Sequence, residues 1–158
     1  MTGWRVGYAA GPEEIISAMI KLQGHVTSNI NSIAQKGAIE ALTGPQEMIE
    51  TMCKEYARRR NYVVKKLNSI RGISCNSPDG AFYVFPNISK LYGASLRDKI
   101  INNGMDVVNY ILEEAHVAVV PGEAFKYPNH IRLSFAISME NIKEGLNRIE
   151  AAINKLIF

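Results

Sequence analysis

The sequence has few of the features that mark secreted, membrane-spanning or nucleic-acid-binding proteins. Among its 158 residues only Cys53 and Cys75 are cysteines, too few for a disulfide framework, so we expect reduced thiols inside the cell. No apolar run approaches the roughly 18 residues of a membrane helix, and the segment after Met1 is not typical of a secretory signal. The formal net charge is +3, which is too weak and too dispersed to favour nucleic acid as a partner.

Several familiar kinds of binding and catalytic site are also missing. No glycine-rich segment has the spacing of a phosphate loop or a dinucleotide fingerprint. His25, His116 and His130 are scattered along the chain without metal-ligand spacing, so we expect no metal site. Ser134 lacks the flanking glycines of a nucleophile elbow. The residues therefore favour none of the simplest nucleotide-binding, metal-dependent or serine-hydrolase interpretations.

The residues that are present are typical of a globular protein rich in helices. Hydrophobic residues make up 47% of the chain and charged residues 21%, which lies in the ordinary globular range. Apolar residues recur at helical spacing in 13–24, 30–42 and 48–70, and each of these patterns predicts a helix. Residues 4–10 are short, apolar and aromatic, and they predict a strand before the first helix.

The second half of the chain predicts a small α+β unit. Strands are expected at residues 73–76, 81–85, 117–120 and 131–137, and helices at 106–115 and 139–156. In the clearest strand, the last, Ile131, Leu133 and Phe135 face one way, and Arg132 and Ser134 face the other. This alternation predicts one buried face and one exposed face.

The predicted strand at residues 4–10 has no predicted neighbours in the helical first half of the chain. A strand without partners leaves its backbone N–H and C=O groups unpaired. We therefore expect residues 1–45 to form the edge of a larger structure, with a sheet supplied from outside this segment.

Two arginines are candidate anion-binding residues. Arg5 lies in the first predicted strand between glycines, and Arg132 lies in the middle of the clearest strand. A guanidinium group is a rigid, permanently charged fork that binds phosphate or carboxylate through paired hydrogen bonds. The alternative for each is a surface arginine or a structural ion pair, and the residues alone leave both possibilities open.

Five motifs in order give the chain a family resemblance. They are Met-Thr-Gly-Trp-Arg-Val-Gly-Tyr at 1–8, Ser-Ile-Ala-Gln at 32–35, Gly-Ala-Phe-Tyr-Val-Phe-Pro at 80–86, Val-Ala-Val-Val-Pro-Gly-Glu-Ala-Phe at 117–125 and Ile-Arg-Leu-Ser-Phe-Ala at 131–136. Together they resemble the class I pyridoxal-phosphate-dependent aminotransferases of the aspartate aminotransferase superfamily, in the style of the bacterial-type subgroup. The resemblance covers the whole chain, and it implies that the chain is the C-terminal part of such an enzyme.

The resemblance also implies a fold class and a domain organisation. The expected class is α/β, with an α+β small domain, as in fold-type I enzymes. Residues 1–45 would be the C-terminal edge of the large cofactor-binding domain, 46–70 a bridging helix and 71–158 the small C-terminal domain. The parent protein is expected to be a cytoplasmic homodimer, with no nucleic-acid or membrane partner.

The chemistry implied by the resemblance is transfer of an amino group between an amino acid, aspartate in the first instance, and a 2-oxo acid. In this family Arg5 matches the arginine that pairs with the pyridoxal phosphate, and Arg132 matches the arginine that grips the substrate α-carboxylate. The lysine that holds the cofactor as a Schiff base would lie just before Met1. We therefore expect no catalytic residue within this chain and no activity from the chain alone.

One departure and two alternative functions stand beside this interpretation. Residues 126–129, Lys-Tyr-Pro-Asn, replace a glycine-rich turn that is common in the family before the strand with the last arginine. The same fold would also suit a carbon–sulfur β-lyase. A non-catalytic α+β oligomerisation module is the third possibility.

Overall fold

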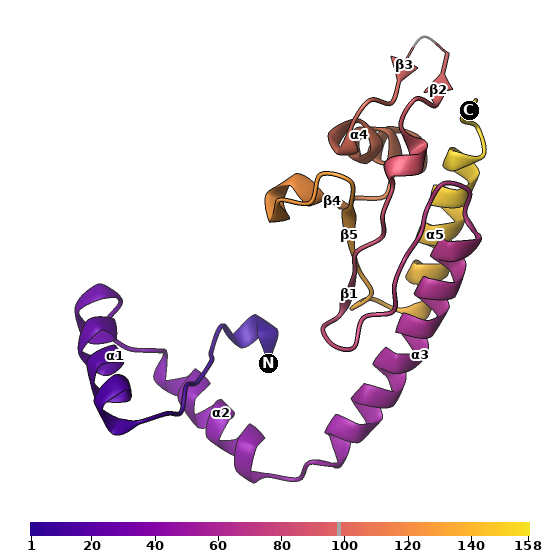
Figure 1. Ribbon diagram of the computed structural model, residues 1–158. Coiled ribbons are helices and arrows are strands. Elements are labelled where there is room, and N and C mark those ends of the chain that lie inside the picture. Colours follow the sequence, from indigo (N-terminus) through magenta and orange to yellow (C-terminus); the bar gives the residue numbers. More distant parts are fainter. Residues whose placement is uncertain (98) are drawn as a thin grey trace. The chain divides into compact units, whose positions relative to one another are not determined.

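The computed structural model describes residues 1–97 and 99–158 (Figure 1). Its helices are α1 (Glu13–Val26), α2 (Ser32–Thr43), α3 (Glu47–Ser69), α4 (Gly104–Ala115) and α5 (Met139–Ile153). Its strands are β1 (Tyr83–Val84), β2 (Ser95–Leu96), β3 (Lys99–Ile100), β4 (Val120–Pro121) and β5 (Ile131–Ser134). Short 3-10 turns occur at η1 (Thr2–Trp4), η2 (Ser89–Leu91) and η3 (Gly122–Phe125). This mixture of helices and small sheets agrees with the expected fold class.

The chain separates into two compact units, Met1–Glu50 and Thr51–Phe158, and each is described by itself. The first unit contains α1 and α2. The Asn31 side chain caps α2 by accepting a hydrogen bond from the Ala34 N–H at 3.1 Å. Among the described residues of this unit only Ala34 is buried, so the unit has almost no hydrophobic core of its own.

The strand predicted at residues 4–10 is wrong for this chain. The 3-10 turn η1 ends at Trp4, and Arg5 follows with a φ of 51°, in the left-handed region. The residues after Arg5 run without regular structure as far as α1. A strand forms only when its backbone hydrogen-bonds to a neighbouring strand. The described residues of this unit contain no other strand with which residues 4–10 could pair.

The second unit is built around a small antiparallel sheet in the order β1-β5-β4. Tyr83 lies opposite Ser134 in the β1–β5 pair, and Val120 lies opposite Arg132 in the β4–β5 pair. The alternation predicted for the last strand is confirmed: Ile131 is buried at 1% exposure, whereas Arg132 is half-buried and Ser134 is exposed. Strand β5 ends at Ser134, however, three residues before the predicted limit at residue 137.

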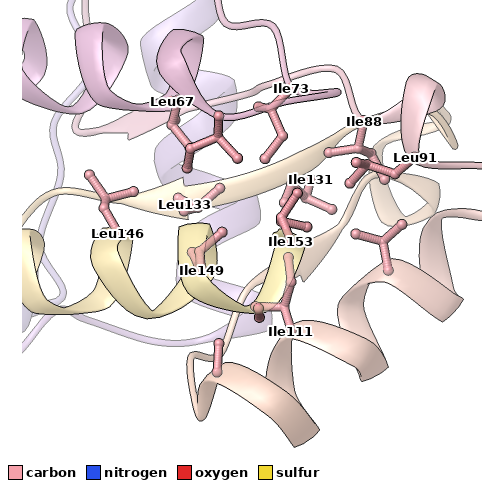
Figure 2. Close-up of a cluster of buried hydrophobic side chains, with 14 of the residues drawn as sticks. Leu67, Ile73, Ile88, Leu91, Ile111, Ile131, Leu133, Leu146, Ile149 and Ile153 are labelled. Atoms are coloured by element: carbon pink, nitrogen blue, oxygen red, sulfur yellow. The ribbon is translucent and has the colours of Figure 1, made fainter. Parts of the chain in front are cut away.

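The core of the second unit lies between the sheet, α3, α4 and α5. Figure 2 shows side chains from these elements pointing toward one another, among them Leu67 of α3, Ile111 of α4, Leu133 of β5 and Ile149 of α5. Helices α3 and α5 run side by side in Figure 1. The ammonium group of Lys66 in α3 pairs with the carboxylate of Glu150 in α5 at 2.5 Å. Burial of this cluster is the main stabilising contribution in the chain.

Two other predicted strands are shorter in the structure than in the sequence analysis. Residues 73–76 contribute only one isolated bridge, between Ser74 and Asn87. The strand predicted at 117–120 shifts toward the C-terminus and forms β4. Residues 90–104, which the sequence patterns did not place, contain the end of η2 and the antiparallel pair β2–β3.

Candidate functional site

Arg132 lies on the partly exposed face of β5. Because side chains alternate along a strand, Arg132 shares this face with Ser134, while Ile131 and Leu133 point into the core. Tyr83 lies opposite Ser134 on β1, so it is a diagonal neighbour of Arg132 across the sheet. Aromatic side chains reach across such a diagonal. The strand pairing therefore brings an aromatic ring toward the guanidinium group.

Two aromatic rings lie against the Arg132 guanidinium. Its Cζ atom is 4.4 Å from the centroid of the Tyr83 ring and 4.8 Å from that of Phe125 in η3. Both distances are within the range of cation–π attraction. Yet Arg132 makes no hydrogen bond or ion pair with any of the residues that the structure describes. The group is thus restrained by rings while its N–H donors remain free for an anion.

The loop between β4 and β5 holds Phe125 in place. Gly122 donates its N–H to the carbonyl of His130 at 2.8 Å, and the Tyr127 N–H returns to the Gly122 carbonyl at 3.0 Å. A Cβ atom at Gly122 would overlap the carbonyl oxygens of Tyr127 and His130, so only glycine allows this approach. Lys126 has a φ of 63° and takes the left-handed conformation that a glycine would favour. The departure at residues 126–129 therefore still forms a tight turn.

A cluster of rings lies behind Phe125. The Phe85 ring meets the Phe125 ring edge-on, with centroids 5.9 Å apart and an interplanar angle of 90°. The Phe85 ring also stacks on the His130 ring, with centroids 4.9 Å apart and an interplanar angle of 15°. Tyr127 meets the Phe85 ring edge-on at 6.0 Å. Of these contacts, only the one with Phe85 touches Phe125, and it restrains the plane of the ring that faces Arg132.

Arg5 lies in the first unit and is exposed. It follows η1, whose Trp4 ring lies so close to α2 that a Cβ added at Gly37 would be 3.2 Å from it. Arg5 has no ion-pair or hydrogen-bond partner within residues 1–97 and 99–158. Its φ of 51° is unfavourable for a residue with a side chain. The same left-handed region is occupied by other residues with side chains, among them His116 and Lys126, so the backbone alone does not single out Arg5.

Some other charged groups pair within the chain. The Arg58 and Arg59 guanidinium groups donate to the Glu55 carboxylate at 2.8 Å and 2.7 Å. These hydrogen bonds lower the pKa of Glu55 from 4.5 to about 2. Cys75 is a core residue, and burial raises the pKa of its thiol, which makes it a poor nucleophile. No cluster of metal-ligating side chains occurs among the described residues.

Sequence reasoning singled out Arg5 and Arg132 but missed Tyr83 and Phe125. Both aromatic residues lie inside the quoted motifs, at 80–86 and 117–125. For Tyr83 the signal that could have found it is the antiparallel pairing of its strand with the strand of Arg132, since pairing places side chains on a common face. Phe125 lies in η3, and only the closed loop after β4 brings it to Arg132. None of the helices in the described ranges is long and apolar enough to cross a membrane.

The second unit therefore presents Arg132, which has no acceptor among the described residues, on the partly exposed face of a small sheet. Residues 1–149 match the family described as aminotransferase class I and II. Because the match covers far more than half of the 158 residues, the chain belongs to this family. The resemblance seen in the five motifs is thereby confirmed.

The relatives carry more specific names. The aspartate aminotransferase of Streptomyces avermitilis is 43% identical over 155 residues, which are 98% of this chain and 38% of that protein. The aspartate aminotransferase of Bacillus subtilis is 46% identical, with the same two shares. The crystal structure of the aspartate aminotransferase from Rhizobium meliloti superposes with a TM-score of 0.92 at 44% identity, over 99% of this chain and 40% of that one. The chain therefore spans about two fifths of the length of these relatives.

Proposed function

We propose that this chain is the C-terminal part of an aminotransferase that uses pyridoxal phosphate to move an amino group between aspartate and a 2-oxo acid. The proposal rests on the family match and on relatives named aspartate aminotransferase that are more than twice as long as this chain. In it, residues 1–45 belong to the large domain, 46–70 form the link and 71–158 form the small domain. A cytoplasmic homodimer follows from the same resemblance.

The observation that carries the proposal is the state of Arg132. Its guanidinium is restrained by Tyr83 and Phe125 and has no acceptor among the described residues. In the proposed enzyme Arg132 binds the α-carboxylate of the amino acid through two parallel N–H···O bonds. Holding the carboxylate in this way fixes the rotation of the substrate, so that its Cα–H bond points in the reactive direction.

Arg5 is proposed to bind the phosphate of the cofactor. The residues present fit that group, because Arg5 is exposed, permanently charged and free of ion-pair partners in the described part of the chain. When bound, pyridoxal phosphate supplies the electron sink for the electrons left as the substrate α-proton departs. The chain's own contribution is to bind and orient two anions. The lysine that moves the proton is expected outside these residues.

The test is an assay of the longer protein that contains this sequence. We expect it to form glutamate from 2-oxoglutarate with aspartate as donor, and to show the absorbance of bound pyridoxal phosphate. The 158-residue chain alone should show neither signal, because it lacks the expected lysine. Amino transfer by the short chain, or none by the long one, would contradict the proposal.

A second product assay separates the β-lyase alternative. A carbon–sulfur β-lyase releases pyruvate and ammonia from a sulfur amino acid, whereas an aminotransferase needs a 2-oxo acid acceptor. We expect ammonia release by the longer protein to be negligible beside amino transfer. The reverse ratio would assign the same carboxylate site to lyase chemistry.

A further inference from the structure

The Arg132 side chain is long and flexible, yet it has to offer its N–H groups in one plane. An arginine that is free in solvent carries considerable rotamer entropy, and much of this entropy is lost when a carboxylate is bound. An ion-pair partner would restrain the group but would also occupy its donors. Aromatic rings restrain a guanidinium without competing for its hydrogen bonds, because they attract the cation through their π faces.

We propose that Tyr83 and Phe125 are positioning residues that hold the Arg132 guanidinium ready for a carboxylate. The two ring centroids lie 4.4 Å and 4.8 Å from Cζ and come from separate elements, β1 and η3. The inference rests on the proposed function of Arg132 for its ligand. The restraint itself is a property of the described residues.

Phe125 acts on Arg132 only because its own ring is fixed. The ring is 40% exposed, so burial alone does not hold it. It is held instead by its edge-on contact with Phe85 and by the loop that Gly122 closes. The β1–β5 pairing sets the backbone position of Tyr83, and its ring also meets the Phe82 ring, with centroids 4.2 Å apart.

The restraint can be measured by NMR on the 158-residue chain with nitrogen-15-labelled arginine. We expect the Arg132 Nε–H proton to be shifted upfield by the two rings, and the group to be more rigid than a freely exposed side chain. Tyr83→Leu and Phe125→Leu should each move the signal downfield and increase its mobility. An Arg132 signal that is unchanged in both leucine variants would overturn the positioning role.

Two matched controls separate ring contact from general disturbance. Tyr83→Phe keeps the ring and should leave the Arg132 signal in place. Tyr127→Leu removes a ring of the same cluster that is 59% exposed and does not touch Arg132, so it should also leave the signal in place. Backbone amide spectra show whether each variant is folded. If Tyr83→Phe shifted the signal as far as Tyr83→Leu, the hydroxyl and not the ring would be responsible, and the proposal would fail.

The longer protein gives a second, independent measurement. Phe125→Leu should raise the KM for the amino acid about tenfold, equivalent to about 1.4 kcal/mol, with a smaller change in kcat. In an Arg132→Ala background the same substitution should have no further effect, because the group it positions is gone. An equal effect in both backgrounds would indicate a merely structural role and overturn the inference.

Failure of the proposed function and failure of the positioning role give different results. A longer protein without amino transfer would end the proposed function but leave the NMR result standing. Active enzyme with a normal Arg132 contribution and no coupling to Phe125 or Tyr83 would end the positioning role but leave the proposed function intact.

Discussion

At the scale of single residues, Arg132 combines a restrained position with free donors. Charged groups in a partly buried position are ordinarily paired, and Arg132 has only aromatic contacts among the described residues. Arg58 and Arg59 show the contrast, because they share the Glu55 carboxylate. An unpaired guanidinium that is held in place is therefore the residue-level evidence for an anion site.

Replacing Arg132 tests this interpretation. In the longer protein Arg132→Ala should raise the KM and lower kcat, with kcat/KM reduced by the equivalent of about 3 kcal/mol, since one charged bidentate contact is lost. Arg132→Lys should recover little, because an ammonium group keeps the charge but not the planar fork. Steady-state kinetics with aspartate measures both variants. An unchanged kcat/KM would remove Arg132 from the site.

Glu55 gives a prediction on pH. Its pKa in the folded chain, about 2, is below the ordinary value of 4.5. A depressed pKa means that the ionised group stabilises the fold above pH 4.5, and that this contribution is lost as the pH falls from 4.5 to about 2. Glu55→Gln should therefore lower the thermal midpoint slightly at neutral pH and have no effect near the lower limit.

The control for this prediction is salt. The Glu55 ion pairs are accessible to solvent, so high salt should weaken the difference between Glu55→Gln and the unchanged chain. Thermal melts followed by circular dichroism measure it. A difference that grows as the pH falls would show that the sign of the linkage is wrong.

At the scale of elements, the turn that joins β4 to β5 carries the site. Gly122→Ala should destabilise the second unit by about 1–3 kcal/mol, because the added Cβ overlaps the carbonyl oxygens of Tyr127 and His130 and forces the loop to move. Denaturant unfolding measures the change. Gly80→Ala is the matched control: nothing lies within 4 Å of its Cβ position, so its effect should stay within about 0.5 kcal/mol. Equal effects would contradict this account of the turn.

The elements that sequence patterns predicted well are those whose signal is local. The helix at 106–115 is confirmed as α4, because its apolar face and its cap lie within a few turns. The alternation in Ile131–Ser134 identified β5 for the same reason. Residues 4–10 misled the prediction, because a strand also needs a partner and composition does not supply one.

The sequence predicted the two arginines of the candidate site but not the aromatic residues beside Arg132. Arg5 and Arg132 stand out because guanidinium groups beside glycines or in a central strand suit anions, and the family resemblance gives each a role. Tyr83 lies far from Arg132 along the chain and meets it through strand pairing, whereas Phe125 lies close in sequence and is turned back toward it by a closed loop. Sequence spacing does not contain that information. The roles of both arginines remain predictions.

At the scale of the whole molecule, the two units differ in how much they bury. The second unit contains a continuous cluster of buried hydrophobic side chains, whereas the described residues of the first unit bury only Ala34. Its helices α1 and α2 expose large apolar residues, such as Ile20 at 66% and Ile33 at 71%. A segment of this kind lacks the burial that offsets the entropy of folding.

Limited proteolysis tests this difference. In the 158-residue chain we expect chymotrypsin or thermolysin to cut first within Met1–Glu50 and to leave a resistant fragment from Thr51–Phe158. The reason is that the free energy of local opening is lowest where few buried contacts are lost. Mass spectrometry of the early fragments locates the cuts. In the longer protein the same sites should be protected. First cuts within the second unit would contradict the division of stability described here.

The most direct measurement is a structure of the longer protein with pyridoxal phosphate and an unreactive amino-acid analogue. We expect Arg132 nitrogens about 2.7–2.9 Å from the two oxygens of the α-carboxylate, with Tyr83 and Phe125 still against the guanidinium. We also expect the Arg5 guanidinium on the cofactor phosphate. Arginine side chains directed into bulk water, with the carboxylate and phosphate bound by other groups, would contradict these expectations.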